Sequence, residues 1–256
     1  MELPFLCGAA FLAGFVDAVA GGGGLIQLPA LLLVLPQQTI PMLFGTNKMS
    51  SICGTAVATV QYARQVPIRW RSILPAAFAA FALSGIGAWA IRSFSTAKPE
   101  ILKPLILGLL IAVALHTAFK KELGEVHQPR MEAGRERLVG LLLGAVIGFY
   151  DGFFGPGTGS FLIIAFVGWF GFDFLNATAS AKVLNLATNL AAVLYFSATG
   201  NILWEFALPM GACNIAGSLI GTRLTILKGN QFVRAIFLAV IALLIARFGW
   251  ELWQGR

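Results

Sequence analysis

The feature that most constrains this chain is an internal duplication. The segment GFVDAVAGGGG at residues 14–24 returns as GFYDGFFGPGTG at residues 148–159, an offset of 134 positions. The same offset relates Lys48 to Lys182 without a gap. Chance hydrophobic similarity would not align both lysines and the aspartates of both segments. The chain is therefore expected to consist of two homologous repeats.

Composition places these repeats in a membrane. Of the 256 residues, 58% are hydrophobic and only 11% are charged, whereas about a quarter of residues are charged in soluble domains. Apolar runs near the roughly 20-residue length that a bilayer core requires recur along the chain. They lie at residues 72–91, 101–119, 207–227 and 232–248. The sequence predicts an all-α polytopic membrane protein without a separate soluble domain.

The net charge of +7 does not indicate a nucleic-acid partner. The 18 lysines and arginines are mostly scattered singly between apolar runs, and they form no dense basic tract. Membrane topology explains them better. The three cysteines are isolated in apolar segments without a CxxC spacing, so they are interpreted as packing residues.

Each repeat is predicted to open with a helical segment that glycines interrupt. Residues 21–24 are four consecutive glycines, and each costs roughly 1 kcal/mol relative to alanine inside a helix. The segment should therefore be two arms with an unwound joint. The predicted organisation is a first transmembrane repeat at residues 1–119, a polar linker at residues 120–137 and a second transmembrane repeat at residues 138–256.

The charge distribution indicates that the repeats are inverted in the membrane. The turn at residues 64–71 carries three arginines, but the equivalent residues 198–204 carry no basic residue and precede Glu205. By the positive-inside tendency, these two turns lie on opposite sides. Inversion requires an odd number of crossings per repeat. A glycine-broken re-entrant segment followed by three transmembrane helices in each repeat satisfies this requirement, with residues 64–71 and 120–137 in the cytoplasm.

Four charged residues lie inside apolar segments as two repeat-related pairs: Asp17 with Asp151, and Lys48 with Lys182. A lysine or aspartate near the bilayer centre costs roughly 2.5–3.5 kcal/mol, so such residues often carry function. Asp17 and Asp151 are predicted as coupling residues that carry protons. The alternative is that each aspartate neutralises a lysine in a structural ion pair, or that the lysines reach towards an interface. Both roles can coexist.

The broken segments favour an anion site between the repeats. The arm after each joint begins with free backbone N–H groups and a partial positive charge, and two such joints can face each other in a repeated transporter. The predicted substrate-binding residues are Gly21, Gly22, Gly23, Gly24, Thr46, Asn47, Lys48, Ser51, Gly155, Gly157, Gly159, Lys182, Asn185 and Asn189. Close helix packing is the alternative for glycines, and it is the preferred explanation for Gly85, Gly87, Gly217 and Gly221.

These motifs together resemble the TauE/SafE sulfite exporter family. The resemblance rests on the joint with its preceding aspartate, the GTNKMSS segment at residues 45–51, its ASAK counterpart at residues 179–182, and the duplication. It covers nearly the whole chain. It implies a multi-pass transporter of small anions in a bacterial or archaeal cytoplasmic (inner) membrane, with sulfite, organosulfonates and related sulfur or carboxylate anions as candidate substrates. Thr46 and Asn47 become Ser180 and Ala181 in the second repeat, so a central site would have unequal halves.

The sequence leads to the hypothesis of a secondary transporter that exports small anions by alternating access, with proton coupling. A passive anion channel is the first alternative. A membrane-embedded enzyme is a more distant one, because the chain contains no HExxH motif, no Ser/His pairing and no cluster of metal ligands. The expected partners are the anion, a coupling proton and the lipid bilayer, with a homodimer as a further option. No metal, cofactor or nucleic acid is expected.

Overall fold

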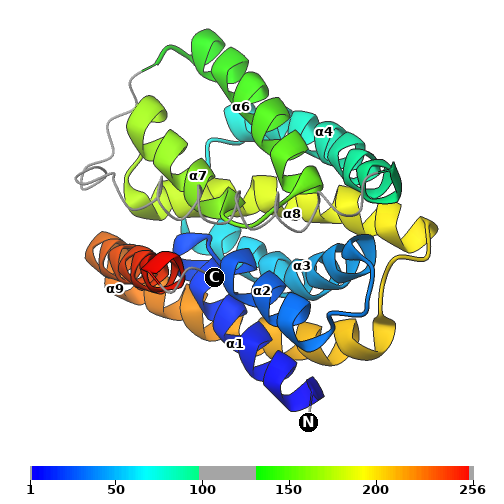
Figure 1. Cartoon of the computed structure of the whole chain (residues 1–256). Coiled ribbons are helices and arrows are strands. Elements are labelled where there is room, and N and C mark those ends of the chain that lie inside the picture. The colour runs from blue at the N-terminus through cyan, green and yellow to red at the C-terminus, as the bar shows by residue number, and fades with distance from the viewer. Residues whose placement is uncertain (1, 98–130, 254–256) are drawn as a thin grey trace.

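The fold is a bundle of helices. The computed structural model describes residues 2–97 and 131–253, although from residue 230 onward Phe232 is the one side chain that it includes. Within these ranges all regular structure is helical (Figure 1). The helices long and apolar enough to cross a membrane are α1 (Glu2–Ala20), α4 (Trp70–Ala97) and α8 (Phe174–Ala198). The predicted all-helical membrane class is thus confirmed. The helix predicted at residues 101–119 and most of the predicted linker lie outside the described residues.

Helix boundaries follow the internal duplication. The remaining helices are α2 (Gly24–Val34), α3 (Ile40–Gln65), α6 (Ala133–Phe153), α7 (Thr158–Ala165), the π-helix η1 (Phe166–Phe170) and α9 (Trp204–Trp253). Helices α2 and α7, α3 and α8, and α4 and α9 each begin 134 positions apart. Helix α9 is interrupted at Gly229, where φ is 67°. Both repeats therefore use the same succession of elements.

Glycine determines where the first helix of each repeat ends. Helix α1 stops at Ala20, and Gly21 then adopts a φ of 74°. The repeat-related Gly155 follows α6 with a φ of 92°, and Gly157 has a φ of 84° just before α7. Side chains disfavour this left-handed conformation, so glycine is required at both joints. Both repeats consequently contain an unwound joint between two helical arms.

The helices after the short arms begin with residues suited to helix N-termini. Asp173 accepts a hydrogen bond from the backbone N–H of Asn176 at 2.7 Å and so caps α8. At the equivalent end of α3, Thr39 precedes the helix and Pro41 lies in its first turn, where the missing N–H is not needed. Different residues thus begin the same helix at the same place in the two repeats.

The two repeats are interwoven through their fourth helices. Helix α1 packs most extensively against α9, and α6 against α4; α9 also contacts α3, and α4 contacts α8. Figure 1 shows the result as two groups, one of α1, α2, α3 and α9 and the other of α4, α6, α7 and α8. Each group combines the first three elements of one repeat with the fourth helix of the other. Helices α3 and α8 meet between the groups.

Small residues allow these helices to approach closely. On α6, Gly148 lies so near α4 that a Cβ atom there would be 2.5 Å from the Ala80 Cα atom. Close contacts of this kind also explain Gly87, Gly217 and Gly221, as predicted. For Gly85 no such contact is seen, because no atom of the described residues lies within 4 Å of the position that its Cβ would take.

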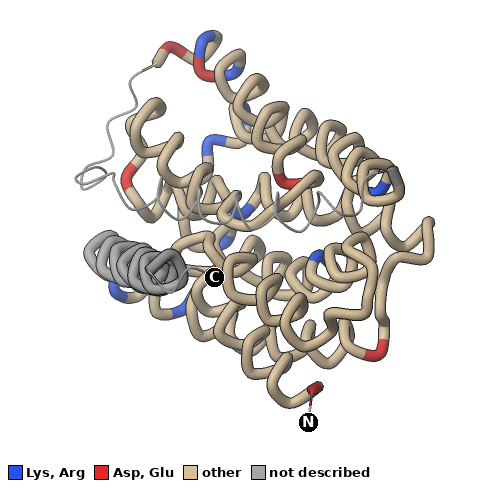
Figure 2. Tube along the Cα trace, viewed as in Figure 1, with Lys and Arg blue, Asp and Glu red and all other residues tan. Residues whose placement is uncertain are grey.

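The outer surface is apolar. Leu33, Phe78 and Val146 are each at least 67% exposed, as expected for side chains that face lipid rather than water. Figure 2 shows that charged residues are sparse along the chain and that a few of them lie among the helices rather than at their ends. At the helix ends, Arg69, which directly precedes α4, forms a 3.1 Å ion pair with the buried Glu136 of α6.

We expect Gly148→Ala to destabilise the protein, because the new methyl group would force α6 away from α4. Overpacking of this kind costs about 1–3 kcal/mol. Thermal unfolding in detergent, followed by tryptophan fluorescence, measures the effect. Gly85→Ala is the matched control, since its methyl group meets no atom in the part of the chain that the structure describes. Equal unfolding temperatures for the two variants would contradict the proposed close contact.

Candidate functional site

The four buried charges form two ion pairs that join the repeats. Lys48 Nζ on α3 lies 2.7 Å from Asp151 Oδ2 on α6. Lys182 Nζ on α8 lies 2.7 Å from Asp17 Oδ2 on α1. Each lysine therefore pairs with the aspartate of the other repeat. The ion-pair alternative raised from the sequence is thus present, and the pairing crosses between the two halves of the chain.

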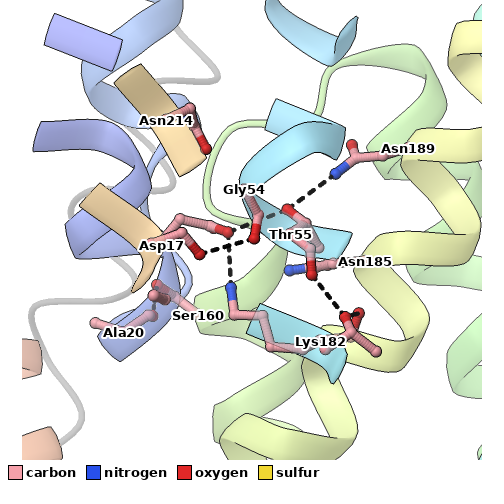
Figure 3. A network of polar contacts seen from close by, with 12 residues as sticks. Asp17, Ala20, Gly54, Thr55, Ser160, Lys182, Asn185, Asn189 and Asn214 are labelled. Atoms are coloured by element: carbon pink, nitrogen blue, oxygen red, sulfur yellow. Dashed lines mark hydrogen bonds and ion pairs between the residues drawn. The ribbon is translucent and has the colours of Figure 1, made fainter. Parts of the chain in front are cut away.

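The two pairs differ in their hydrogen bonds. Lys182 donates to Asp17 Oδ2, and the Thr55 hydroxyl donates to the same oxygen at 3.4 Å (Figure 3). Lys48 instead donates to Asn189 Oδ1 at 3.2 Å. Its short contact with Asp151 is not aligned as a hydrogen bond, and Asp151 Oδ2 has no hydrogen-bond partner among the described residues. The first pair is therefore better satisfied than the second.

The two glycine joints lie against each other. The Ser160 backbone N–H donates to the Gly21 carbonyl at 3.2 Å, and the Ser160 hydroxyl donates to the Ala20 carbonyl at 2.9 Å. A Cβ atom on Gly21 would lie 2.5 Å from the Gly159 Cα atom, and one on Gly159 equally close to Gly21. Side chains at these positions would separate the joints. The second joint also lies beside an ion pair, since a Cβ atom on Gly155 would be 3.1 Å from Lys48 Nζ.

A narrow cavity separates the joints from α3 and α8. It is lined by Asp17, Gly21, Gly24, Asn47, Lys48, Ser51, Thr55, Asp151, Gly155, Gly157, Thr158, Gly159, Asn185 and Asn189. Its volume is about 30 Å³, which suits a few water molecules at most. The structure thus brings most of the predicted site residues together around a space too small for an organosulfonate.

Four predicted substrate-binding residues do not line the cavity: Gly22, Gly23, Thr46 and Lys182. The two glycines form the turn that starts α2, where their carbonyl groups accept the first N–H groups of that helix. The Thr46 hydroxyl donates to the Met42 carbonyl and accepts from the Leu203 N–H, so it connects α3 to the start of α9. Lys182 is fully buried on Asp17.

Sequence reasoning missed Thr55 and Thr158, which also line the cavity. Thr55 lies 134 positions before Asn189, and the Asn189 side-chain amide donates to the Thr55 hydroxyl at 3.5 Å. Two repeat-related residues thus contact each other directly. The helical spacing of Lys48, Ser51 and Thr55 on one face of α3 could have identified Thr55.

Gln27 is a second residue that sequence reasoning missed. It is fully buried on α2, and its amide donates to the Asn47 carbonyl at 3.2 Å. Its side-chain oxygen accepts from Asn214 at 3.0 Å and from Ser50 at 3.4 Å. These bonds attach α2 to α3 and α9 beside the cavity. A lone amide in an otherwise apolar 11-residue helix is the signal that could have identified it.

Two buried amides face the cavity with unused hydrogen-bonding capacity. The side-chain oxygens of Asn47 and Asn185 have no partner among the described residues, and both residues are at least 94% buried. Buried polar atoms without partners are uncommon in folded proteins. Either end of an amide can turn to a ligand. With the hydroxyls of Ser51 and Thr55, the cavity can therefore donate several hydrogen bonds next to the Lys48 ammonium group.

An interwoven helical repeat with broken helices and paired charges at its centre defines a class, the multi-pass membrane transporters built from internal repeats. The family comparison agrees with this class. The model of the family described as Sulfite exporter TauE/SafE matches residues 6–248. The chain therefore belongs to the TauE/SafE family.

Individual relatives carry corresponding names. The chain is 40% identical to a probable membrane transporter protein, ORF9, of Sinorhizobium sp., over 95% of this chain and 91% of the relative. It is 36% identical to a probable membrane transporter protein of Haemophilus influenzae, over 97% and 95% of the two chains. It is 32% identical to the probable membrane transporter protein YfcA of Escherichia coli K12, over 96% and 91%. No solved structure gives a significant match.

We expect Lys182→Met to destabilise the fold, because it leaves the Asp17 carboxylate without its counterion. Removing one partner of a buried pair costs about 3–5 kcal/mol, and the 21% exposure of the Asp17 side chain should lower this to about 2–4 kcal/mol. Thermal unfolding in detergent measures the loss. The double variant Asp17→Asn/Lys182→Met should recover most of it. A double variant no more stable than Lys182→Met would show that the pair does not stabilise the fold.

Proposed function

We propose that the protein is a secondary transporter that exports small anions, such as sulfite, organosulfonates or related carboxylates, across a bacterial or archaeal cytoplasmic membrane. The observation that carries this proposal is the cavity between the glycine joints and helices α3 and α8, with a buried lysine at its wall. The printed family description, sulfite exporter, supports sulfite as the first substrate to test. The names of the relatives support transport rather than catalysis.

The cavity wall provides what a small oxyanion needs. The Lys48 ammonium group supplies a full positive charge, and a hydrogen bond between charged groups is stronger than one between neutral groups. The amides of Asn47, Asn185 and Asn189 and the hydroxyl of Ser51 add neutral donors. Glycine at position 155 leaves the backbone open beside Lys48, since a Cβ atom there would lie 3.1 Å from Nζ.

The small cavity volume favours alternating access over an open pore. An organosulfonate does not fit the present space, so the helices around the joints must separate to admit it and close behind it. The unwound joints are suited to this movement because they lack the hydrogen bonds of a continuous helix. A passive channel would instead need a continuous opening past the same residues.

We include inverted repeats in the proposal. Two inverted repeats could open the site by equivalent movements towards the two sides of the membrane. In Figure 1 the repeat-related helices α3 and α8 run in opposite directions across the view, as do α4 and the first part of α9. Helix α2 has 11 residues, too few for the roughly 20 of a full crossing, which supports a re-entrant arm. Helix α1 has 19 residues, so it is longer than the half-depth arm expected from the sequence.

The test is saturable uptake of sulfite and of sulfoacetate into proteoliposomes, with and without an imposed pH gradient. Lys48→Ala should lower this uptake at least about tenfold, since a hydrogen bond to a charged group contributes about 1.5–3 kcal/mol. The matched control is Arg64→Ala, which removes an exposed positive charge from the same helix.

Each outcome bears on a particular part of the proposal. Accumulation of the anion against its gradient would exclude a passive channel. Uptake by the Lys48→Ala variant equal to that of the Arg64→Ala variant would remove Lys48 from the site. If the parent protein moved neither anion, the proposed substrate class would be wrong.

A further inference from the structure

The two ion pairs are equivalent in the sequence but unequal in the structure. Asp17 accepts hydrogen bonds from Lys182 and Thr55, and its side chain is 21% exposed. Asp151 is 5% exposed, and its Oδ2 atom contacts Lys48 Nζ at 2.7 Å without an aligned hydrogen bond. Asp151 Oδ2 is thus held by the ion-pair contact alone, without a hydrogen bond from the described residues. The Lys48–Asp151 pair is therefore the easier one to open.

The two lysines also differ in their access to the cavity. Lys48 lines the cavity and donates to Asn189 as well as contacting Asp151, so it keeps one partner when the carboxylate leaves. Lys182 does not line the cavity, and its side chain is fully buried on Asp17. An anion that enters the cavity therefore meets Lys48 directly. It would have to displace Asp17 before it could reach Lys182.

We propose that Asp151 releases Lys48 to the incoming anion and takes up a proton as it does so, while the Lys182–Asp17 pair stays closed. This inference rests on the proposed anion transport and assigns its coupling to one of the two pairs. Before the exchange, Lys48 is neutralised by the Asp151 carboxylate. Afterwards it is neutralised by the anion, and the carboxyl group carries the proton. No covalent bond to carbon or sulfur changes.

Charge balance then sets the stoichiometry. The two lysines and two aspartates together carry no net charge, and unbalanced charge is costly at this depth. A monoanion adds one negative charge, which the proton on Asp151 cancels. The exchange of a monoanion is therefore electroneutral, with one proton for each anion that binds. A passive pore, or a carrier coupled through both aspartates, would not be restricted to one proton for each anion.

No other described charged group replaces Asp151 in this role. Of the helices packed on α6, α8 carries Lys182, which is occupied by Asp17, and α7 carries no charged residue. Helix α4 carries Arg71 and Arg92, both exposed and near its ends. On α6 itself, the neighbouring Tyr150 hydroxyl donates to the Pro156 carbonyl at 2.6 Å. Lys48 is the described charge that Asp151 faces directly.

The test compares Asp151→Asn with the repeat-related Asp17→Asn, using methanesulfonate, which remains a monoanion throughout the working pH range. Proton uptake on binding is measured by calorimetry of the purified protein in two buffers that differ in ionisation enthalpy. The parent should take up about one proton per bound anion, Asp151→Asn close to none, and Asp17→Asn about one, whatever their maximal rates. Asp151→Glu should restore the uptake because it keeps a carboxyl group.

Proteoliposome uptake of methanesulfonate provides a second readout. Uptake by the parent should respond to a pH gradient but not to a potassium diffusion potential set with valinomycin, because the exchange moves no net charge. The response to the pH gradient should disappear in Asp151→Asn. If that variant does not fold, Asp151→Ser replaces it in both measurements, with gel filtration as the check of folding.

Two kinds of failure are distinguishable. Proton uptake that survives in Asp151→Asn, that is lost equally in Asp17→Asn, or that accompanies potential-driven flux in the parent would overturn this assignment and leave anion transport intact. A parent protein that neither binds methanesulfonate nor transports sulfite would overturn anion transport itself, and this assignment with it.

Discussion

The structure depends on charge pairing across the duplication. A lysine or an aspartate inside an apolar bundle needs a counterion close by, and here each finds it on the other repeat, at 2.7 Å in both cases. Neither repeat can bury its own charges alone. The packing of the helices shows the same dependence. Helix α9 of the second repeat packs against α1 of the first, and α4 of the first repeat packs against α6 of the second. Folding of one half is therefore tied to the presence of the second.

Close backbone contact at the joints supports this arrangement. Gly21 and Gly159 touch without intervening side chains, and the Ser160 bonds fasten one joint to the end of α1. Bringing two unwound segments together exposes backbone polar groups that the bilayer cannot satisfy. The polar residues of α3 and α8 surround them instead, and Gln27 fixes the adjoining arm. The unwound joints and the polar residues of α3 and α8 therefore depend on each other, because the polar residues surround the backbone groups that the joints expose.

The positions of the joints and of the buried charges could be predicted from the sequence, because each feature occurs twice at a constant offset. The offset of 134 located the joints and the four buried charges, and the helix starts follow it. The roles of individual side chains could not be predicted, since Lys48 and Lys182 occupy equivalent positions and differ through tertiary neighbours such as Asn189 and Asp17. The exchange of fourth helices was also beyond reach, because hydrophobic periodicity marks a buried face without naming its partner. Gly85 shows the same limit, because it lies in a membrane helix and no atom of the described residues comes within 4 Å of its Cβ position.

The contact between Thr55 and Asn189 has a consequence for how such a chain could arise. In a dimer of two identical half-length chains, a residue on the symmetry axis meets its own copy, so a threonine would face a threonine and an asparagine an asparagine. Fusion into one chain removes that restriction and permits two different groups to meet, as Thr55 and Asn189 do. The two sides of the molecular centre can then carry different chemical groups, which no strictly symmetric ancestor could do.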